Sequence, residues 1–345
     1  MRFHSPVINL PFPDAESVIV REKAAHNREE GRALTRFSNE YDVTRKVRTT
    51  DPVAVNREVE RIFLDLYSES STRPLDQAFG DVTRLFSGEY PGFRACDTAY
   101  HDIQHTLDVT LAMARLIDGY ERARTKGMES FNAELFQLGI VTALCHDIGY
   151  LREEHDQLAQ NGAEYTMTHV SRGAQFLRDY LPKLGMGRLG DVAASLIHFT
   201  GYEIPVGKIQ VPGTKFRVLG NLLGSADIIS QMADRCYLEK CRDRLYPEFL
   251  AAGIARRREP DGREQVVFAS GDDLVLKTPG FYRGANKRLE DDLAGSYKLA
   301  EHHFGGQNLY LEEVAKNIRF AQEVSDEGNT SALRRVPPST LAEAG

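Results

Sequence analysis

Apolar residues recur along most of the chain at the three- and four-residue spacing that places them on one face of an α-helix. The pattern starts at Asp51, a residue suited to cap a helix, and Pro52 follows at the first helical position. Five apolar residues then share one face: Val55, Val59, Ile62, Phe63 and Leu66. This segment predicts a helix, and the repetition of its pattern predicts an all-α fold.

The same periodicity returns in a run of five segments. They cover residues 100–122, 131–148, a stretch from just before His169 to Pro182, 189–199 and 216–245. Residues 131–148 are apolar on nearly all sides, so we expect a central buried helix there. Helices are expected again in residues 284–304 and 308–324, whereas residues 263–276 fit either a short hairpin or an irregular segment.

The helical pattern divides the chain into three parts. Residues 1–50 are polar and mixed, and we expect a loosely structured arm with short helices. Residues 51–325 form one predicted main domain, with its core at about 95–245. Residues 326–345 contain two prolines and are predicted to be a disordered tail.

Composition narrows the class of protein further. The 345 residues carry a formal net charge of −7, which argues against a nucleic-acid partner because phosphate neutralisation needs a basic surface. No apolar run approaches the roughly 20 residues of a membrane span, and the N-terminus lacks a signal-peptide pattern. The four cysteines have no C-x-x-C spacing and are expected as reduced thiols. We therefore expect a soluble, cytoplasmic protein without a membrane partner, and its oligomeric state stays open.

The candidate chemistry lies in histidines and aspartates that the successive predicted helices contribute. Six positions form the set: His105, His146, Asp147, His169, His198 and Asp227. Helices joined by loops of this length can stack antiparallel and point these residues into a shared interior. Imidazole and carboxylate together suit divalent transition metals, and a carboxylate in the apolar stretch around Asp227 is costly unless it is paired or binds metal.

Two divalent ions divide the set sensibly. The first would be held by His105, His146, Asp147 and Asp227. The second would be held by His169, His198 and a bridging Asp147. Adjacent residues diverge by about 100° on a helix, so His146 and Asp147 reach one ion only if the helix ends there, as Gly149 indicates. Each residue alone also fits a helix cap, a surface position or half of an ion pair, but their joint order favours metal. The pattern does not distinguish iron, manganese, zinc or magnesium.

The order H…HD…H…H…D resembles that of the HD-domain metal-dependent phosphohydrolases, over about residues 100–227. The segment "YHDIQH" is also similar to the Tyr-His-Asn-x-x-His segment of class I cyclic-nucleotide phosphodiesterases. In that family the second histidine binds metal and the first is the proposed general acid, so the resemblance implies these roles for His105 and His101. It also implies an HD-type helical bundle with additional N- and C-terminal helices. The chain departs from the family at Asp102, where the family has Asn, and at Gly149-Tyr150, where it has Asp-His.

The implied reaction is hydrolysis of a small, nucleotide-like phosphate ester, cyclic esters included. Two divalent ions would lower the pKa of a bridging water and give a hydroxide nucleophile, with Asp147 central to the site. If residues 100–122 are helical, His101 shares a face with His105 and can protonate the leaving oxygen, although a supporting or surface role fits equally well. Arg172 fits either a phosphate contact or a helix surface.

Two other functions use the same ligands. Myo-inositol oxygenase and the HD-type phosphonate oxygenases hold a di-iron centre with a similar six-residue set, so the ligand pattern alone does not separate oxygenase from hydrolase. The phosphodiesterase-like "YHDIQH" favours hydrolysis, because a proton donor beside the metal suits a leaving alkoxide. A regulatory HD module that binds a ligand without catalysis is the third reading, and the presence of all six positions argues against it.

Overall fold

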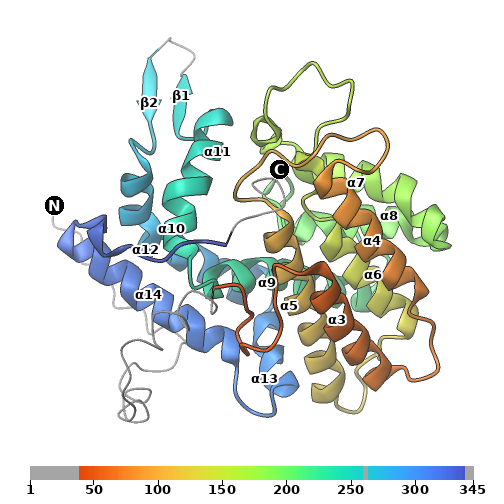
Figure 1. The fold of residues 1–345 in the computed structure, drawn as a ribbon. Helices are drawn as coiled ribbons and strands as arrows, with labels where there is room; N and C mark the ends of the chain where they lie inside the picture. The colour runs from red at the N-terminus through yellow and green to blue at the C-terminus, as the bar shows by residue number, and fades with distance from the viewer. Residues whose placement is uncertain (1–38, 259–262, 339–345) are drawn as a thin grey trace.

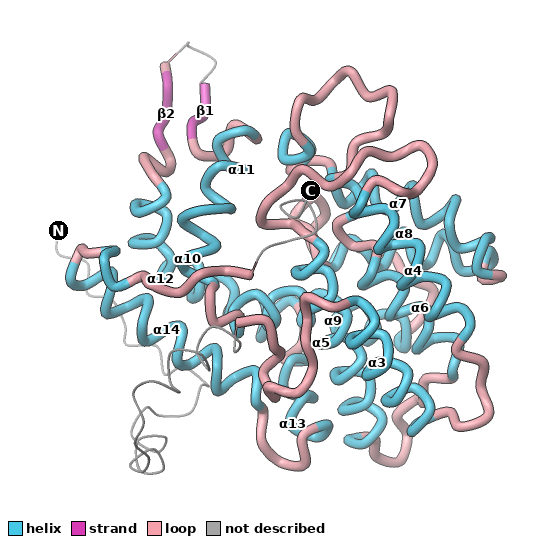
Figure 2. Tube along the Cα trace, viewed as in Figure 1, coloured by secondary structure: helices cyan, strands magenta, loops and turns pink. Residues whose placement is uncertain are grey.

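The computed structural model describes residues 39–258 and 263–338, and their secondary structure is helical apart from one small two-stranded sheet (Figure 2). The predicted all-α fold is therefore confirmed. Short helices expected in residues 1–38, and the end of the predicted tail, lie outside the described residues. None of the described helices combines the length and the apolarity needed to cross a membrane.

The first described helix begins where the sequence predicts, and a second one follows it. They are α3 (Pro52–Leu66) and α4 (Arg73–Ser87). The carboxylate of Asp51 accepts the backbone N–H groups of Val53 and Ala54, which caps α3. Four of the five predicted apolar positions of α3 are buried, and this face packs against α4 and α5.

Two helices form the centre of the molecule. They are α5 (Ile103–Ala123) and α9 (Thr214–Ala233), which pack against each other. Three further helices lie on one side: α6 (Ala133–Leu144), α7 (His169–Tyr180) and α8 (Gly190–Leu196) (Figure 1). Every residue of α6 from Leu135 to Leu144 is buried, as its uniformly apolar sequence predicts.

A second group of elements lies on the other side of α5 and α9 (Figure 1). It consists of α10 (Tyr237–Lys240), a π-helical turn (Cys241–Leu245), α11 (Tyr246–Ala251), the antiparallel strands β1 (Arg256–Arg258) and β2 (Glu264–Val266), and α12 (Gly271–Lys287). The chain continues through α13 (Ala300–His303), which packs against α5, and α14 (Leu309–Glu327), which packs against α9 and α12. Helix α14 confirms the prediction for residues 308–324. Residues 263–276 match neither alternative, because they contain only β2, whose partner β1 precedes the segment, and α12 already begins at Gly271.

Two predicted helices are interrupted. The segment 216–245 is not one helix, because α9 ends at Ala233 and the backbone of Asp234 is extended. The Asp234 carboxylate accepts the N–H of Cys236 at 2.8 Å and binds Lys240 Nζ at 2.6 Å, so it starts the next helical turn. Likewise, α12 starts well before residue 284, and the chain turns at Ala294 and Gly295, where φ is positive.

Candidate metal centre

The His-Asp pair lies in a turn rather than on a helix. Helix α6 ends at Leu144, and His146 and Asp147 precede a short 3-10 helix (Ile148–Tyr150). The helix end that Gly149 indicates is confirmed. Gly149 also lies against α7, where a Cβ atom would come 1.8 Å from the carbonyl oxygen of His169. A residue without a side chain is therefore needed for the turn and α7 to approach this closely.

Three of the candidate ligands form a compact buried cluster. Nε2 of His146 lies 3.1 Å from Oδ2 of Asp147, and Nε2 of His105 lies 3.3 Å from the same oxygen. The two Nε2 atoms are 3.2 Å apart. Atoms that bind one ion at about 2.0–2.2 Å stand about 3–3.5 Å from one another, so these separations fit a shared metal ion. The cluster of His105, His146 and Asp147 can hold a metal.

The hydrogen bonds around the cluster leave lone pairs pointing inward. Nδ1 of His146 lies 2.8 Å from the carbonyl oxygen of Ala143, and Nδ1 of His169 lies 2.7 Å from that of Thr166. Because a carbonyl only accepts, each Nδ1 carries the hydrogen and each neutral ring presents the Nε2 lone pair. Oδ2 of Asp147 is buried without a hydrogen-bond partner in the described chain. A cation could accept the lone pairs of both Nε2 atoms and of this carboxylate oxygen.

A proton on Nε2 of His146 is the alternative to a cation at this position, and the electrostatics of the pair favour positive charge there. Burial opposes both charges, yet the pairing with Asp147 raises the pKa of His146 to about 9. The same pairing holds the pKa of Asp147 well below its ordinary value, against the effect of burial. The site therefore stabilises positive charge between the imidazoles and the carboxylate.

Two more candidate ligands lie at the edge of the cluster. Oδ1 of Asp227 is 3.6 Å from Nε2 of His105, and Nε2 of His169 is 3.7 Å from the second oxygen of Asp147. Asp147 thus has His105 and His146 beside one carboxylate oxygen and His169 beside the other, and a bridge between two ions stays a prediction. Asp227 accepts a 2.6 Å hydrogen bond from Gln231, and Gln231 accepts one from the Tyr100 hydroxyl.

His198 lies apart from this group. It belongs to the 3-10 turn Ile197–Phe199 that follows α8. Among the described residues, no hydrogen bond or ion pair joins it to Asp147 or to the other candidate ligands. Its Nδ1 is buried without a partner, and burial lowers its pKa. The structure therefore brings five of the six candidate ligands together and leaves His198 outside ion-pair distance.

His101 does not share a helix face with His105, so that part of the sequence prediction is wrong. Helix α5 begins at Ile103 because the carboxylate of Asp102 caps it, accepting the N–H of His105 at 2.9 Å. His101 is held instead by Glu248, whose Oε2 lies 2.5 Å from Nδ1. Burial opposes a charged imidazole, yet the charge and hydrogen bond of Glu248 raise the pKa of His101 above its ordinary value.

Tyr150 fixes the relative position of His101 and His169. Its ring stacks on His101 at 4.3 Å between centroids and on His169 at 4.4 Å, with planes within 18° and 19°. The tyrosine thus contacts both rings, whose own centroids lie 6.5 Å apart. In the class I phosphodiesterases that the sequence resembles, this position belongs to the second Asp-His pair, so the resemblance gave no role for Tyr150.

Two residues of the cluster, His105 and Asp147, line a cavity of about 840 Å³ together with His101, His169 and Asp227. We call the part of the cavity that these five residues line its floor. Arg172 does not line it, and its guanidinium donates to the carbonyl oxygens of Gly149 and Leu151 at 2.8 and 3.0 Å. Arg172 therefore supports the turn that carries the His-Asp pair.

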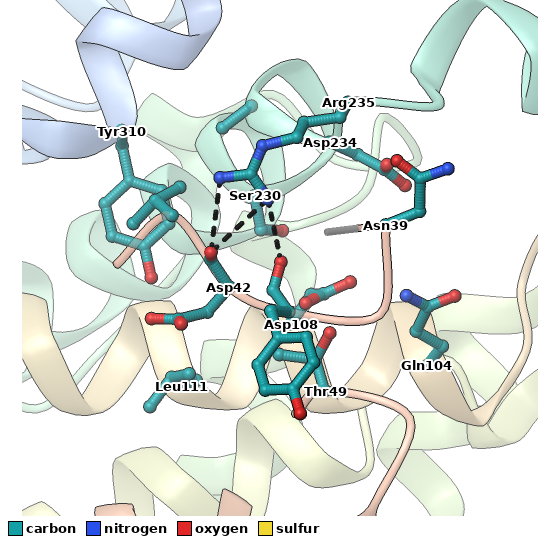
Figure 3. Close-up of a pocket in the computed structure, with 13 residues that line it drawn as sticks. Asn39, Asp42, Thr49, Gln104, Asp108, Leu111, Ser230, Asp234, Arg235 and Tyr310 are labelled. Atoms are coloured by element: carbon teal, nitrogen blue, oxygen red, sulfur yellow. Dashed lines mark hydrogen bonds between the residues drawn. The ribbon is translucent and has the colours of Figure 1, made fainter. Parts of the chain in front are cut away.

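A second polar cavity, between α5 and α9, is far smaller than the first. It holds about 30 Å³ and is lined from α5 by Gln104 and Asp108 and from α9 by Ser230 (Figure 3). This is room for about one or two waters. Arg235 closes it by donating to the carbonyl oxygen of Tyr41 at 3.0 Å, so it belongs to the packing of the N-terminal segment.

No protein-family model matches the chain, and no curated protein matches its sequence. The resemblance to HD-domain enzymes therefore rests on the residues and their arrangement, and the family stays a prediction.

Proposed function

We propose that this protein is a metal-dependent phosphohydrolase that cleaves a phosphate ester at the floor of the large cavity. The observation that carries the proposal is the convergence of Nε2 of His105 and Nε2 of His146 on the unpartnered Oδ2 of Asp147. Buried carboxylates without hydrogen-bond partners are rare, and two imidazole nitrogens beside one is the donor set of a divalent-metal site.

His105, His146, Asp147 and Asp227 would hold one ion, and Asp147 with His169 would hold a second. Bound divalent ions supply Lewis-acid stabilisation of a phosphate oxygen and a hydroxide at neutral pH. Water then supplies the oxygen of the new bond to phosphorus, and the bond from phosphorus to the ester oxygen breaks. His198 lies outside the set, so fewer protein groups would hold the second ion than the sequence predicts.

The arrangement of His101 favours hydrolysis over oxygenation. Its Nδ1 is bonded to Glu248, so Nε2 is the ring nitrogen left for a substrate in the cavity. The buried carboxylate stabilises the imidazolium, which can deliver the Nε2 proton to the departing alkoxide. An oxygenase needs no such donor beside a leaving oxygen. That the substrate is nucleotide-like stays a prediction from the sequence resemblance.

The test combines metal analysis with turnover. Protein expressed with metal supplementation and purified without oxygen should contain about two transition-metal ions per chain and hydrolyse bis-p-nitrophenyl phosphate anaerobically. Asp147→Ala should lose both the metal and the activity. His155→Ala is the matched control, because His155 is exposed and lies outside the cavity. Absence of bound metal would sink the proposal, and turnover only in air would indicate the oxygenase instead.

A further inference from the structure

The large cavity has two chemically different halves. The floor carries the candidate ligands, whereas the wall opposite the α7 side is apolar. That wall comes from the π-helical turn, α11, the base of the hairpin and α12. Its side chains are Leu245, Phe249, Ile254, Phe268, Leu274 and Phe281. An apolar wall of this extent, adjoining a charged floor, suits a ligand with one charged end and one hydrocarbon end.

The wall offers little to a second polar group. Lys277 is the one lysine or arginine among the described residues that line the cavity. Two of the three hydrogens of its ammonium are already donated, to the carbonyl oxygen of Val267 and to Asp273, both at 2.8 Å. The hydroxyl of Thr278 donates to the carbonyl oxygen of Leu274. One ammonium hydrogen of Lys277 is then left for a sugar or a second phosphate, so most polar groups buried here would lose water without gaining partners, which is costly.

The rim of the cavity is also apolar. Met167, Tyr202 and Phe281 all line the cavity, yet 68, 75 and 42% of their surfaces are exposed. Single exposed apolar residues are ordinary, but three around one cavity entrance mark a ligand-binding surface. A hydrocarbon group that leaves the cavity would cover these side chains.

We propose that the substrate is a phosphate ester with an extended aliphatic group, the phosphate lying on the candidate metal centre and the hydrocarbon along the apolar wall. This inference rests on the proposed phosphohydrolase function and narrows its substrate class. It also replaces the nucleotide-like ester that the sequence resemblance implies, because the wall offers few of the hydrogen-bond partners that a base and a sugar require.

A chain-length series tests the inference. Methyl, butyl and octyl esters of p-nitrophenyl phosphate share one scissile bond and differ in hydrocarbon, and thymidine 5′-p-nitrophenyl phosphate is the nucleotide comparison. Below micellar concentrations, kcat/KM should rise about three- to fourfold for each added methylene until the wall is covered. A flat series, or faster turnover of the thymidine ester than of the octyl ester, would overturn the inference.

A binding measurement separates the two proposals. Ethyl-, butyl- and octylphosphonate cannot be hydrolysed, and their affinity for the metal-loaded protein can be measured by calorimetry. If affinity rises with chain length although no ester is cleaved, the phosphohydrolase proposal fails and the apolar ligand class stands. If esters are cleaved but affinity does not depend on chain length, the phosphohydrolase proposal stands and the apolar ligand class fails.

Two variants locate the hydrocarbon. Phe281→Ser removes a rim side chain that is already 42% exposed, so folding should be kept. Leu250→Ser is the matched control, because Leu250 is 47% exposed and does not line the cavity. The preference for octyl over methyl ester should fall about tenfold in Phe281→Ser and stay unchanged in Leu250→Ser. Equal effects of the two variants would contradict the placement of the hydrocarbon along this wall.

Discussion

At the scale of single residues, Glu248 decides how His101 acts. The two residues are 147 positions apart in the chain, and the carboxylate also accepts the backbone N–H of Tyr100 at 2.5 Å. Glu248→Gln keeps the size of the side chain and removes its charge. Hydrolysis of esters with an alkyl-alcohol leaving group should then fall about 100-fold, because the imidazolium loses its partner. Esters of p-nitrophenol should lose less than tenfold, because that leaving group needs no proton.

The pH profile gives an independent readout of the same change. The charge of Glu248 raises the pKa of His101, so removing it should lower that pKa. A general acid works while it is protonated, and the basic limb of kcat should therefore move to lower pH in Glu248→Gln. Metal content should match that of the unaltered protein. Equal losses on both classes of ester, with an unmoved basic limb, would contradict the role of His101 as acid.

At the scale of elements, the close approach of the turn after α6 to the start of α7 sets the distance between Asp147 and His169. Gly149→Ala places a Cβ atom 1.8 Å from the carbonyl oxygen of His169, so α7 must move away. We expect metal affinity to fall about 10- to 100-fold and stability by about 1–3 kcal/mol. Metal titration and urea unfolding measure the two effects. Gly207→Ala is the control: Gly207 is also the middle residue of a 3-10 helix, but nothing lies within 4 Å of its Cβ position. Similar losses in both variants would contradict the steric argument.

The helices that carry the candidate ligands show why the sequence predicts part of the site and not the rest. The compact ligands His105, His146 and Asp147 follow from helix order, because each lies at or near the end of an apolar helix that has to be buried. The position of His101 could not be predicted in this way. The apolar pattern begins before the first residue of α5, so it does not reveal that Asp102 caps the helix and leaves His101 outside it. Glu248 leaves no local signal either, because no spacing rule connects residues on distant elements. His198 has the spacing of a ligand, but the 3-10 turn that ends α8 places it elsewhere.

At the scale of the whole molecule, the buried ion pair between Arg115 and Asp42 binds the segment before α3 to the central and C-terminal helices. The guanidinium of Arg115 on α5 binds the carboxylate of Asp42 and donates to the hydroxyl of Tyr310 on α14 at 3.0 Å. Asp42 also accepts the N–H of Val47 at 3.0 Å. Figure 3 shows Asp42 and Tyr310 beside the small polar cavity that Arg235 closes. The first described residues are thus part of the packed molecule.

The stabilisation from this ion pair should decrease as the pH falls, because the pKa of Asp42 is lowered in the folded protein. Burial works against the charged carboxylate, but Arg115 and the hydrogen bond from Val47 hold the pKa below its ordinary value of 3.8. A carboxyl whose pKa is lower in the folded state stabilises the fold fully above its unfolded pKa, and this contribution is lost as pH falls through the folded pKa.

Asp42→Asn tests this attachment, because it leaves the buried Arg115 without its charged partner. We expect it to lower the free energy of unfolding at pH 7 by about 3 kcal/mol. The difference from the unaltered protein, measured by urea unfolding, should stay constant down to about pH 4 and shrink below it. Asp65→Asn is the control, since Asp65 forms an exposed pair with Arg61 that is worth about 0–1 kcal/mol. A difference for Asp42→Asn no larger than that of the control, or one that grows as pH falls, would show that this pair does not fasten the segment.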